Sequence, residues 1–525
     1  MKRRDFLATT AAGAIGALAA PALAQGDARV LRFVPEGDLS SPDPVWTTTT
    51  VASNHAYMIY DMLYARDESY MPQPQMVAGH ETSDDKLTWT FTLRDGLVFH
   101  DGEKVRAIDC VTSINRWSKR NPFGQKLASV TNELTALDDK RLQFRLKKPF
   151  ALLLNALAQG PFMMPERVAK TDPFEKITEY VGSGPFKFLT DQWVTGVQAI
   201  YERNANYVPR QEPPNLYGGG KVVNVDRVEW KIMPDPATAA GALTNNEVDW
   251  WQSPSPDLVP MLRQARGVKA EVMNRVGAVA VLRPNFLYPP FKDNPKLIQA
   301  IASVVNQEDF MVAIAGDEKE MYHVPSGVFT PGMPMANDAG MELYTGKRDF
   351  DHAKQLVKES SYKGEPIVLM SPSDYAHLQA MAQVAADLMK RIGLNVQYTS
   401  MDWGTLVQRR ASKEPPEKGG WNAFVTTWAG LSVADPAPHA PIRGNGMNAW
   451  FGWPTSPKLE ELREQWFDAP DLAAQKKICE EIQREVFAEG TFLPLGQYFS
   501  PTAFRANVEG IIPAPSPLFW NVRKV

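Results

Sequence analysis

The chain has 525 residues, of which 44% are hydrophobic and 22% are charged, with 56 basic and 60 acidic side chains. At about 150 residues per domain, this length predicts two to four domains, each large enough to bury its own core. The formal net charge of −4, together with the lack of a basic stripe, argues against a protein that binds nucleic acid or an anionic membrane surface.

Residues 1–24 have the pattern of a secretory signal peptide. Basic residues at 2–4 precede an alanine-rich apolar run that ends in the cleavage pattern Ala22-Leu23-Ala24. The arginine pair at 3–4, followed by Asp-Phe-Leu, fits the twin-arginine pathway, which exports folded proteins. An uncleaved membrane anchor is the alternative, and no other segment approaches the ~18 apolar residues that span a bilayer. We therefore expect a mature protein in the periplasm.

Strands and helices alternate along the rest of the chain. Alternating or continuous apolar residues predict strands at 87–93, 141–146, 226–232 and 423–428. Apolar residues at helical spacing predict helices over 107–117, from Pro295 onward, over 381–392 and over 471–489. Stretches rich in glycine, proline and polar residues predict loops at 209–220 and 410–420. The pattern contains no internal repeat and predicts mixed α/β domains.

The sequence contains no complete pattern for catalysis or for metal binding. The stretch GGGK (218–221) lacks the spacing of a phosphate loop, and Ser360-x-x-Lys363 lacks a Lys-Thr-Gly partner. The seven histidines are scattered without ligand spacing. Cys110 and Cys479 lie among apolar neighbours, so we expect two buried free thiols, with a disulfide as the alternative. We therefore expect neither an enzyme nor a bound metal or cofactor.

Tryptophan is abundant, with 14 residues in the chain. Several lie in or beside predicted loops: Trp46, Trp250, Trp251, Trp403, Trp428, Trp450 and Trp453. Aromatic walls with a few fixed polar groups are how proteins bind small organic ligands in a cleft. Ordinary core packing is the alternative for any one of them, but as a set they favour a binding function.

The stretch WAGLSVADPAPHAPIRGNG (428–446) places Asp435, His439 and Arg443 at intervals of four residues. This spacing would stack the three side chains on one face of a helix, as in a catalytic trio. Three prolines in the same stretch prevent a regular helix, so the spacing does not indicate a trio. The sequence instead predicts a proline-stiffened loop, which loses little conformational entropy when it captures a ligand.

Four stretches, in order along the chain, carry a family resemblance: TSDDKLTWTFTLRDGLVFHDGEKVRAIDCVTSINRW (82–117), VGSGPFKFLTDQWVTGVQAIYERNANY (181–207), VDRVEWKIMPDPATAAGALTNNEVDWW (225–251) and DNPKLIQAIASVVNQEDFM (293–311). In order and spacing they resemble the family 5 extracellular solute-binding proteins of bacterial ABC importers, the dipeptide-, oligopeptide- and nickel-binding group. The resemblance covers essentially the whole mature chain.

The resemblance implies an α/β, two-lobed periplasmic-binding-protein fold of the class II, cluster C type, with an extra domain inserted in the first lobe. By motif order, lobe I takes residues 25–58, 196–282 and 498–525, the inserted domain takes 59–195, and lobe II takes 283–497. Two crossing segments are expected to join the lobes, and lobe closure over the solute excludes water and strengthens polar contacts.

The resemblance also implies a function. We expect a monomer that captures a small peptide or another organic solute and delivers it to an ABC permease in the inner membrane. A ligand-sensing receptor or chaperone-like binder, with the same fold but without transport, is the alternative. These two classes differ in whether the protein acts together with a permease.

Two departures from the family pattern concern the solute. Peptide-binding members hold the peptide ammonium with an aspartate three residues after a tryptophan, but Leu431 stands at that offset from Trp428, and Asp435-Pro436 follows one residue later than expected. The loop 371–377 (SPSDYAH) lacks the arginine with which dipeptide binders hold the carboxylate. Desolvating a zwitterion without these partners would cost about 1–3 kcal/mol per charge or more. We therefore expect organic anions or modified peptides rather than free dipeptides.

Four tryptophans are candidates for contact with the solute. Trp428 ends the predicted strand 423–428, and α/β sheets bind ligands at the carboxyl ends of parallel strands. Trp251 follows the predicted strand-and-helix unit 226–247. Trp46 and Trp403 are further candidates because they also lie in or beside predicted loops.

Two charged residues of the 428–446 loop complete the predicted site. The planar guanidinium of Arg443 suits a carboxylate, sulfonate or phosphate, and Asp435 is the second charged candidate. A surface arginine, or one that pairs with Asp435 to brace the loop, is the alternative for Arg443.

Overall fold

The computed structural model describes residues 29–316, 318–469 and 471–525. The predicted signal peptide, with its twin-arginine pattern, lies outside the described residues. Within the described ranges, no single helix has the length and apolar character needed to cross a membrane, although the bent pair α9 (Pro295–Ala302) and α10 (Gln307–Ala315) passes that test jointly. Leu297, Ile301 and Phe310 of this pair are buried in the protein core.

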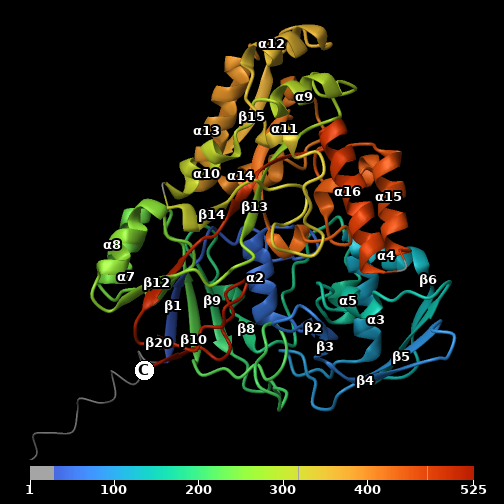
Figure 1. The fold of residues 1–525 in the computed structure, drawn as a ribbon. Coiled ribbons are helices and arrows are strands. Elements are labelled where there is room, and N and C mark those ends of the chain that lie inside the picture. Colours follow the sequence, from blue (N-terminus) through green and yellow to red (C-terminus); the bar gives the residue numbers. More distant parts are fainter. Residues whose placement is uncertain (1–28, 317, 470) are drawn as a thin grey trace, which may run out of the picture.

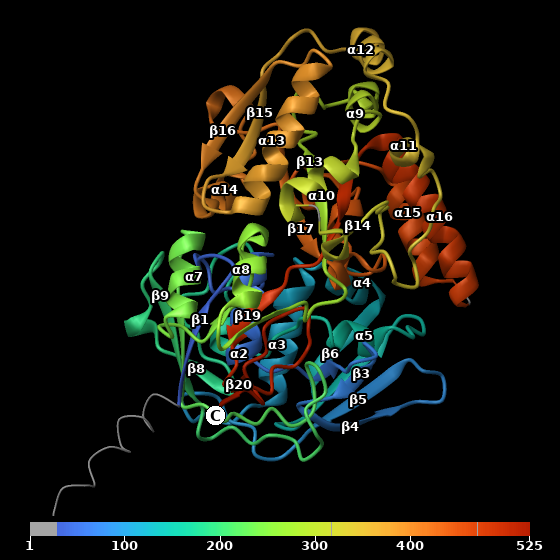
Figure 2. The ribbon, with the colours of Figure 1, turned by 60° about the vertical axis from the view of Figure 1, so that its left-hand side comes forward.

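The first lobe is built on a seven-stranded sheet (Figures 1 and 2). Its central strand β1 (Val30–Val34) pairs in parallel with β10 (Arg227–Lys231) and β11 (Trp250–Trp251), and the outer strands are antiparallel. One side of the sheet buries Phe33 and Trp230, and the other buries Val34 together with the helices α7 and α8. The remaining elements are β12 (Val268–Glu271), β19 (Thr502–Arg505), β9 (Gln198–Arg203), β8 (Phe186–Phe188), α2 (Thr50–Ile59), α7 (Pro236–Thr244) and α8 (Val259–Gln264).

The second lobe is built on a six-stranded sheet, at the top of Figure 2. Strand β17 (Ala423–Ala429) lies inside this sheet, antiparallel to β13 (Ala278–Pro284) and parallel to β15 (Ile367–Pro372). Strand β17 is buried along most of its length, which accounts for the apolar residues Ala423, Phe424, Val425 and Trp428 in it. The other elements are β14 (Tyr322–His323), β18 (Leu493–Tyr498), β16 (Val396–Met401), α12 (Phe350–Glu359), α13 (Ala376–Arg391), α14 (Trp403–Arg409), α15 (Pro457–Phe467) and α16 (Leu472–Glu489).

A third unit lies between β1 and β8 in the chain and contains a four-stranded antiparallel sheet (Figure 1, lower right). Its strands are β4 (Val77–Thr82), β5 (Thr88–Leu93), β7 (Arg141–Leu146) and β6 (Thr131–Ala136), and its helices are α3 (Ala107–Ser118), α4 (Pro122–Val130), α5 (Leu153–Leu157) and α6 (Glu166–Ala169). The short strands β2 (Tyr64–Arg66) and β3 (Pro72–Pro74) lead into it. Cys110 on α3 and Cys479 on α16 are buried free thiols, as predicted.

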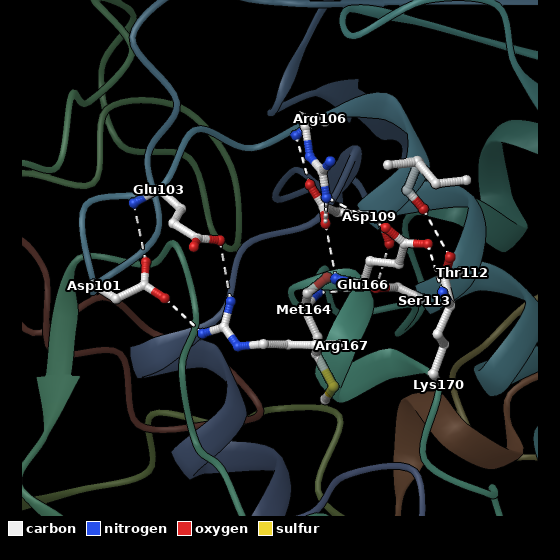
Figure 3. A network of polar contacts seen from close by, with 11 residues as sticks. Asp101, Glu103, Arg106, Asp109, Thr112, Ser113, Met164, Glu166, Arg167 and Lys170 are labelled. Carbon is white, nitrogen blue, oxygen red and sulfur yellow. Dashed lines mark hydrogen bonds and ion pairs between the residues drawn. The ribbon is translucent and has the colours of Figure 1, made fainter.

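A polar network fixes α3 to α6 in the third unit (Figure 3). The Asp109 carboxylate accepts hydrogen bonds from the backbone N–H groups of Arg106 and Glu166, each at 2.7 Å. Ser113 Oγ accepts from the backbone N–H of Met164 at 2.9 Å. Because a buried carboxylate is costly unless its oxygens are bonded, these contacts determine where α3 begins and how α6 docks on it.

Two short segments join the seven-stranded and six-stranded sheets. Residues 272–277 connect β12 to β13, and residues 499–501 connect β18 to β19. The fold therefore has two lobes with two crossings, as the resemblance implied. Strand β8, within the range expected for the inserted domain (59–195), pairs in the seven-stranded sheet of the first lobe. Strand β13, which spans the expected lobe boundary at 282–283, pairs in the six-stranded sheet of the second lobe. We propose that the lobe boundaries fall within the two crossing segments.

The second lobe also contacts the third unit directly, where α15 lies beside α4 in Figures 1 and 2. Lys126 of α4 forms an ion pair with Glu464 of α15, and its ammonium lies 4.8 Å from the ring centroid of Phe467. The Phe467 ring is 6.1 Å from that of Phe123, and Lys148 pairs with Asp468 at 2.6 Å. These contacts, here called the α4–α15 contact, hold the two lobes together at one end.

Candidate ligand-binding site

A cavity of about 530 Å³ lies between the lobes and is lined by residues from the first lobe, the third unit and the second lobe. Its volume lies in the range of roughly 300–1,000 Å³ that is usual for small-molecule sites. Five of the seven loop tryptophans named above are on its wall: Trp46, Trp403, Trp428, Trp450 and Trp453. Trp117 of α3 also lines the cavity, although its position inside a predicted helix gave no sign of this.

Trp428 lies at the carboxyl end of β17 and forms part of the cavity wall. Its side chain is largely buried, and its ring meets that of Trp450 edge-on, with centroids 4.9 Å apart. Its indole Nε1 is buried and has no hydrogen-bond acceptor among the described protein atoms. Trp428 therefore contributes an aromatic surface to the cavity, and its buried N–H donor has no partner in the protein.

The loop after β17 contains no regular α-helix, as its prolines predicted. It forms three short 3-10 turns, at Gly430–Val433, Ala440–Ile442 and Gly446–Asn448. The buried Arg283 of β13 holds the loop in place by donating hydrogen bonds to the carbonyls of Pro441 at 2.9 Å and Phe451 at 2.7 Å. These hydrogen bonds hold the loop in place without a ligand.

The three evenly spaced polar residues of this loop are not brought together. The side chain of Asp435 accepts from the backbone N–H of Ala437 at 2.9 Å and is not part of the cavity wall. Burial raises its pKa. His439 is fully buried, with Nε2 3.0 Å from the carbonyl oxygen of Val328, and burial lowers its pKa to about 3. The three residues do not form a catalytic trio.

Arg443 reaches the cavity wall, and two of its three guanidinium nitrogens contact protein groups. Its Nε lies 3.0 Å from Glu460 Oε1, and its Nη1 donates to Gln125 Oε1 at 2.8 Å. Of the two alternatives to a ligand role, Arg443 thus fits a residue that braces the loop better than an arginine on the surface. Its partner, however, is Glu460 and not Asp435. Since Gln125 lies on α4 and Glu460 on α15, Arg443 links the loop to the α4–α15 contact.

The other predicted tryptophans differ in their positions. Trp403 begins α14 on the cavity wall, and its ring lies 5.2 Å from that of Tyr375. Trp46 also lines the cavity, with the Lys176 ammonium 4.3 Å from its ring centroid. Trp251, in contrast, packs in the core of the first lobe with Leu243 and is not part of the wall.

The charged groups on the wall are mostly basic, and sequence reasoning missed most of them. Six are cationic and only Glu36 is acidic; the cationic residues are Arg66, Lys119, Arg120, Arg410, Lys413 and Arg443. Glu36 follows β1, and burial raises its pKa to about 7, against lowering contributions from Thr50 and Tyr375. Arg66 is the last residue of β2, and its electrostatic partner is Asp435, which is not part of the wall. The cavity is therefore suited to a ligand with negative charge.

Arg410 is the most deeply buried of these cations, ahead of Arg443, which is 7% exposed. Arg410 is only 3% exposed, and burial lowers its pKa to about 9, so it stays charged at neutral pH. Trp403, Trp450 and Phe451 surround the guanidinium. Across the three described ranges, no group of His, Cys, Asp and Glu has the arrangement needed for a metal ion.

The family model for "Bacterial extracellular solute-binding proteins, family 5 Middle" matches residues 71–448. The chain belongs to this family. A relative from Sinorhizobium fredii named "Probable peptide ABC transporter periplasmic-binding protein" is 39% identical over 533 residues, covering 100% of this chain and 99% of that protein. Family 5 proteins are binding components of transporters rather than enzymes, and they reside in the periplasm or outside the cell.

Solved structures of other family 5 proteins share the fold. The binding protein AgaA of A. tumefaciens, in complex with agropinic acid, gives a TM-score of 0.78 at 19% identity and covers 94% of this chain and 99% of its own. DppA from Helicobacter pylori, in complex with the peptide STSA, gives 0.78 at 21% identity and covers 95% and 99%. At these identities the likeness shows the two-lobed family 5 fold.

Proposed function

We propose that this protein is the solute-binding component of an ABC importer, which captures an organic solute in the cavity between its lobes and delivers it to an inner-membrane permease. The observation that carries the proposal is the cavity itself, because its wall combines both lobes with five of the loop tryptophans. A ligand bound there favours the closed arrangement by its differential affinity for that state. The named function of the Sinorhizobium relative supports peptide transport.

We further propose a solute with anionic character, either a modified peptide or a non-peptide organic acid. Leu431 lies on the cavity wall where peptide binders of the resemblance have an aspartate, so no carboxylate at this position meets a peptide ammonium. The excess of cationic over acidic residues on the wall favours the same class of solute. Export by the twin-arginine pathway, which the N-terminal sequence pattern favours, and a monomeric state, which the family resemblance implies, belong to this proposal.

A thermal-shift screen of the purified mature protein tests the proposal. A ligand present at 100 times its Kd adds about 2.7 kcal/mol to the free energy of unfolding, which raises the melting temperature visibly. We expect organic acids and modified peptides to raise it more than free dipeptides do. A strong response confined to plain dipeptides would contradict the proposed solute class, and silence across the whole panel would count against solute binding.

Two variants locate the site for any compound that responds. Trp428→Ala removes an aromatic surface from the cavity wall, so we expect a smaller shift, whereas Trp251→Phe changes a core residue away from the wall and should keep the shift. Reconstitution with the cognate permease then separates transport from sensing. Ligand-dependent stimulation of ATP hydrolysis in proteoliposomes is expected for an importer and not for a receptor that acts alone.

A further inference from the structure

Arg410 is a buried cation that has no anion within the protein. It stands at the C-terminal end of α14, and its Nε is completely buried. Among the described residues, no hydrogen-bond acceptor or carboxylate contacts its guanidinium, and burial alone accounts for the direction of its pKa shift. Buried arginines are normally paired, because the desolvation of an unpaired charge is costly.

Other buried arginines of this chain follow that rule. Arg116 donates to both carboxylate oxygens of Asp43, at 3.0 and 2.7 Å. Arg283 has no carboxylate but donates to backbone carbonyls, including that of Thr491 at 2.7 Å. The fold therefore satisfies deeply buried guanidinium groups where they have a structural role, and Arg410 is an exception on the wall of the cavity.

The surroundings of Arg410 are aromatic. Its guanidinium carbon lies 4.9 Å from the ring centroid of Phe451, 5.8 Å from that of Trp403 and 5.9 Å from that of Trp450. We call these four residues the Arg410 box. Aromatic faces attract a cation, but they offer no acceptor for its N–H groups. The box thus holds the charge in position and leaves its hydrogen-bonding capacity unused.

The fully buried side-chain atoms without a partner, among the residues of this wall, are all of one kind. They are the Nε atoms of Arg66 and Arg410 and the Nε1 atoms of Trp428 and Trp450. All four are N–H donors, and no partnerless buried acceptor among the described residues belongs to a residue of the same wall. Roughly 90% or more of buried polar groups in proteins are hydrogen-bonded, so this excess of donors among the wall residues favours a ligand that supplies acceptors.

We propose that Arg410 binds a carboxylate of the solute and that the Arg410 box is the carboxylate subsite of the cavity. A carboxylate offers two acceptor oxygens that match the planar fork of a guanidinium. Trp450 connects this subsite to Trp428, since their rings lie 4.9 Å apart. The inference rests on the proposed function and moves the anion-binding role from Arg443, which Glu460 already engages, to Arg410.

Matched pairs of ligands test this subsite. The probes are the peptide Ser-Thr-Ser-Ala beside its C-terminal amide and benzoate beside benzamide, each measured by calorimetry and by thermal shift. In the wild type we expect each carboxylate to bind more tightly than its amide. In Arg410→Met we expect carboxylate binding to be weaker by roughly 30-fold or more, because a buried charge pair is lost, with little change for the amides.

Lys418→Met is the control, because Lys418 is an exposed cation of the same 410–420 stretch and is not part of the cavity wall. We expect it to keep the preference for carboxylates within about twofold, since exposed charges contribute little. Circular dichroism of both variants checks that they fold, and Arg410→Lys, which keeps the charge without the fork, should restore part of the preference.

The outcomes separate this inference from the proposed function. An unchanged preference in Arg410→Met, or equal loss of carboxylate and amide binding, overturns the carboxylate subsite. Wild-type protein that binds the amides but not the acids also overturns it and leaves solute binding intact. Failure of the wild type to bind any probe counts against both.

Discussion

Single residues of the 428–446 stretch have roles that depend on partners far away in the chain. Arg443 is engaged by Glu460 and by Gln125, which lies 318 residues away in sequence, so its guanidinium braces the loop. Arg410 has the opposite environment, with aromatic rings and no acceptor. The same residue type therefore serves structure at one position and is available for a ligand at the other.

The bracing role of Arg443 leads to a prediction about stability. Arg443→Gln leaves the partly buried Glu460 with fewer donors, and we expect the free energy of unfolding to fall by about 1–3 kcal/mol in urea denaturation. Lys458→Gln removes an exposed pair with Glu461 on the same helix and should change it by less than about 0.5 kcal/mol. If Arg443→Gln leaves the free energy of unfolding unchanged but abolishes carboxylate binding, Arg443 binds the ligand and does not brace the loop.

At the scale of elements, the predicted strands and helices are present with small shifts at their ends. The predicted strand 87–93 is β5, the predicted helix 107–117 is α3, and the helix expected to end before Gly490 is α16. Local periodicity predicts such elements well because each buries one face or one stripe. The position of Trp428 followed from the same reasoning, since β17 ends at the cavity.

The end of β17 depends on close backbone contact at Gly430. A Cβ at Gly430 would come within 2.6 Å of the carbonyl oxygen of Val276, so Gly430→Ala has to displace the strand end that carries Trp428. We expect a loss of about 1–3 kcal/mol in unfolding free energy and weaker ligand binding. Gly241→Ala is the control, because it lies in α7 with open space around it and should stabilise by about 0.5–1 kcal/mol. Equal effects of the two changes would contradict the importance of close packing at Gly430.

For the whole molecule, the α4–α15 contact adds a connection between the lobes beyond the two crossing segments. The side chain of Lys126 is only 3% exposed, whereas that of Lys148 in the neighbouring ion pair is 45% exposed. A buried charge that loses its partner is costly, but an exposed pair contributes little. The two lysines should therefore differ in how much they hold the lobes together.

This difference can be measured first without a ligand and then by solute binding. We expect Lys126→Met to favour separated lobes, with a larger radius of gyration in small-angle X-ray scattering and weaker binding of any solute, because it removes both the ion pair of the buried ammonium with Glu464 and its contact with the Phe467 ring. Lys148→Met should leave both quantities close to those of the wild type. A larger change from Lys148→Met than from Lys126→Met would show that the α4–α15 contact does not hold the lobes in this way.

The amino-acid sequence by itself determined the α/β class, the family, the main elements and the proline-stiffened loop, because these depend on periodicity, on backbone constraints and on motifs within short windows. It also predicted Trp428, Trp403 and Trp46 as ligand contacts, and all three lie on the cavity wall. Only the tertiary structure decided that Trp251 lies in the core, that Arg443 is engaged and that Arg410 is buried. The stretch 410–420 has the composition of an exposed loop, but Arg410 is buried and contacts the rings of Trp450 and Phe451, about 40 residues later in the chain. Burial and charge pairing arise from such distant approaches, which no local pattern encodes.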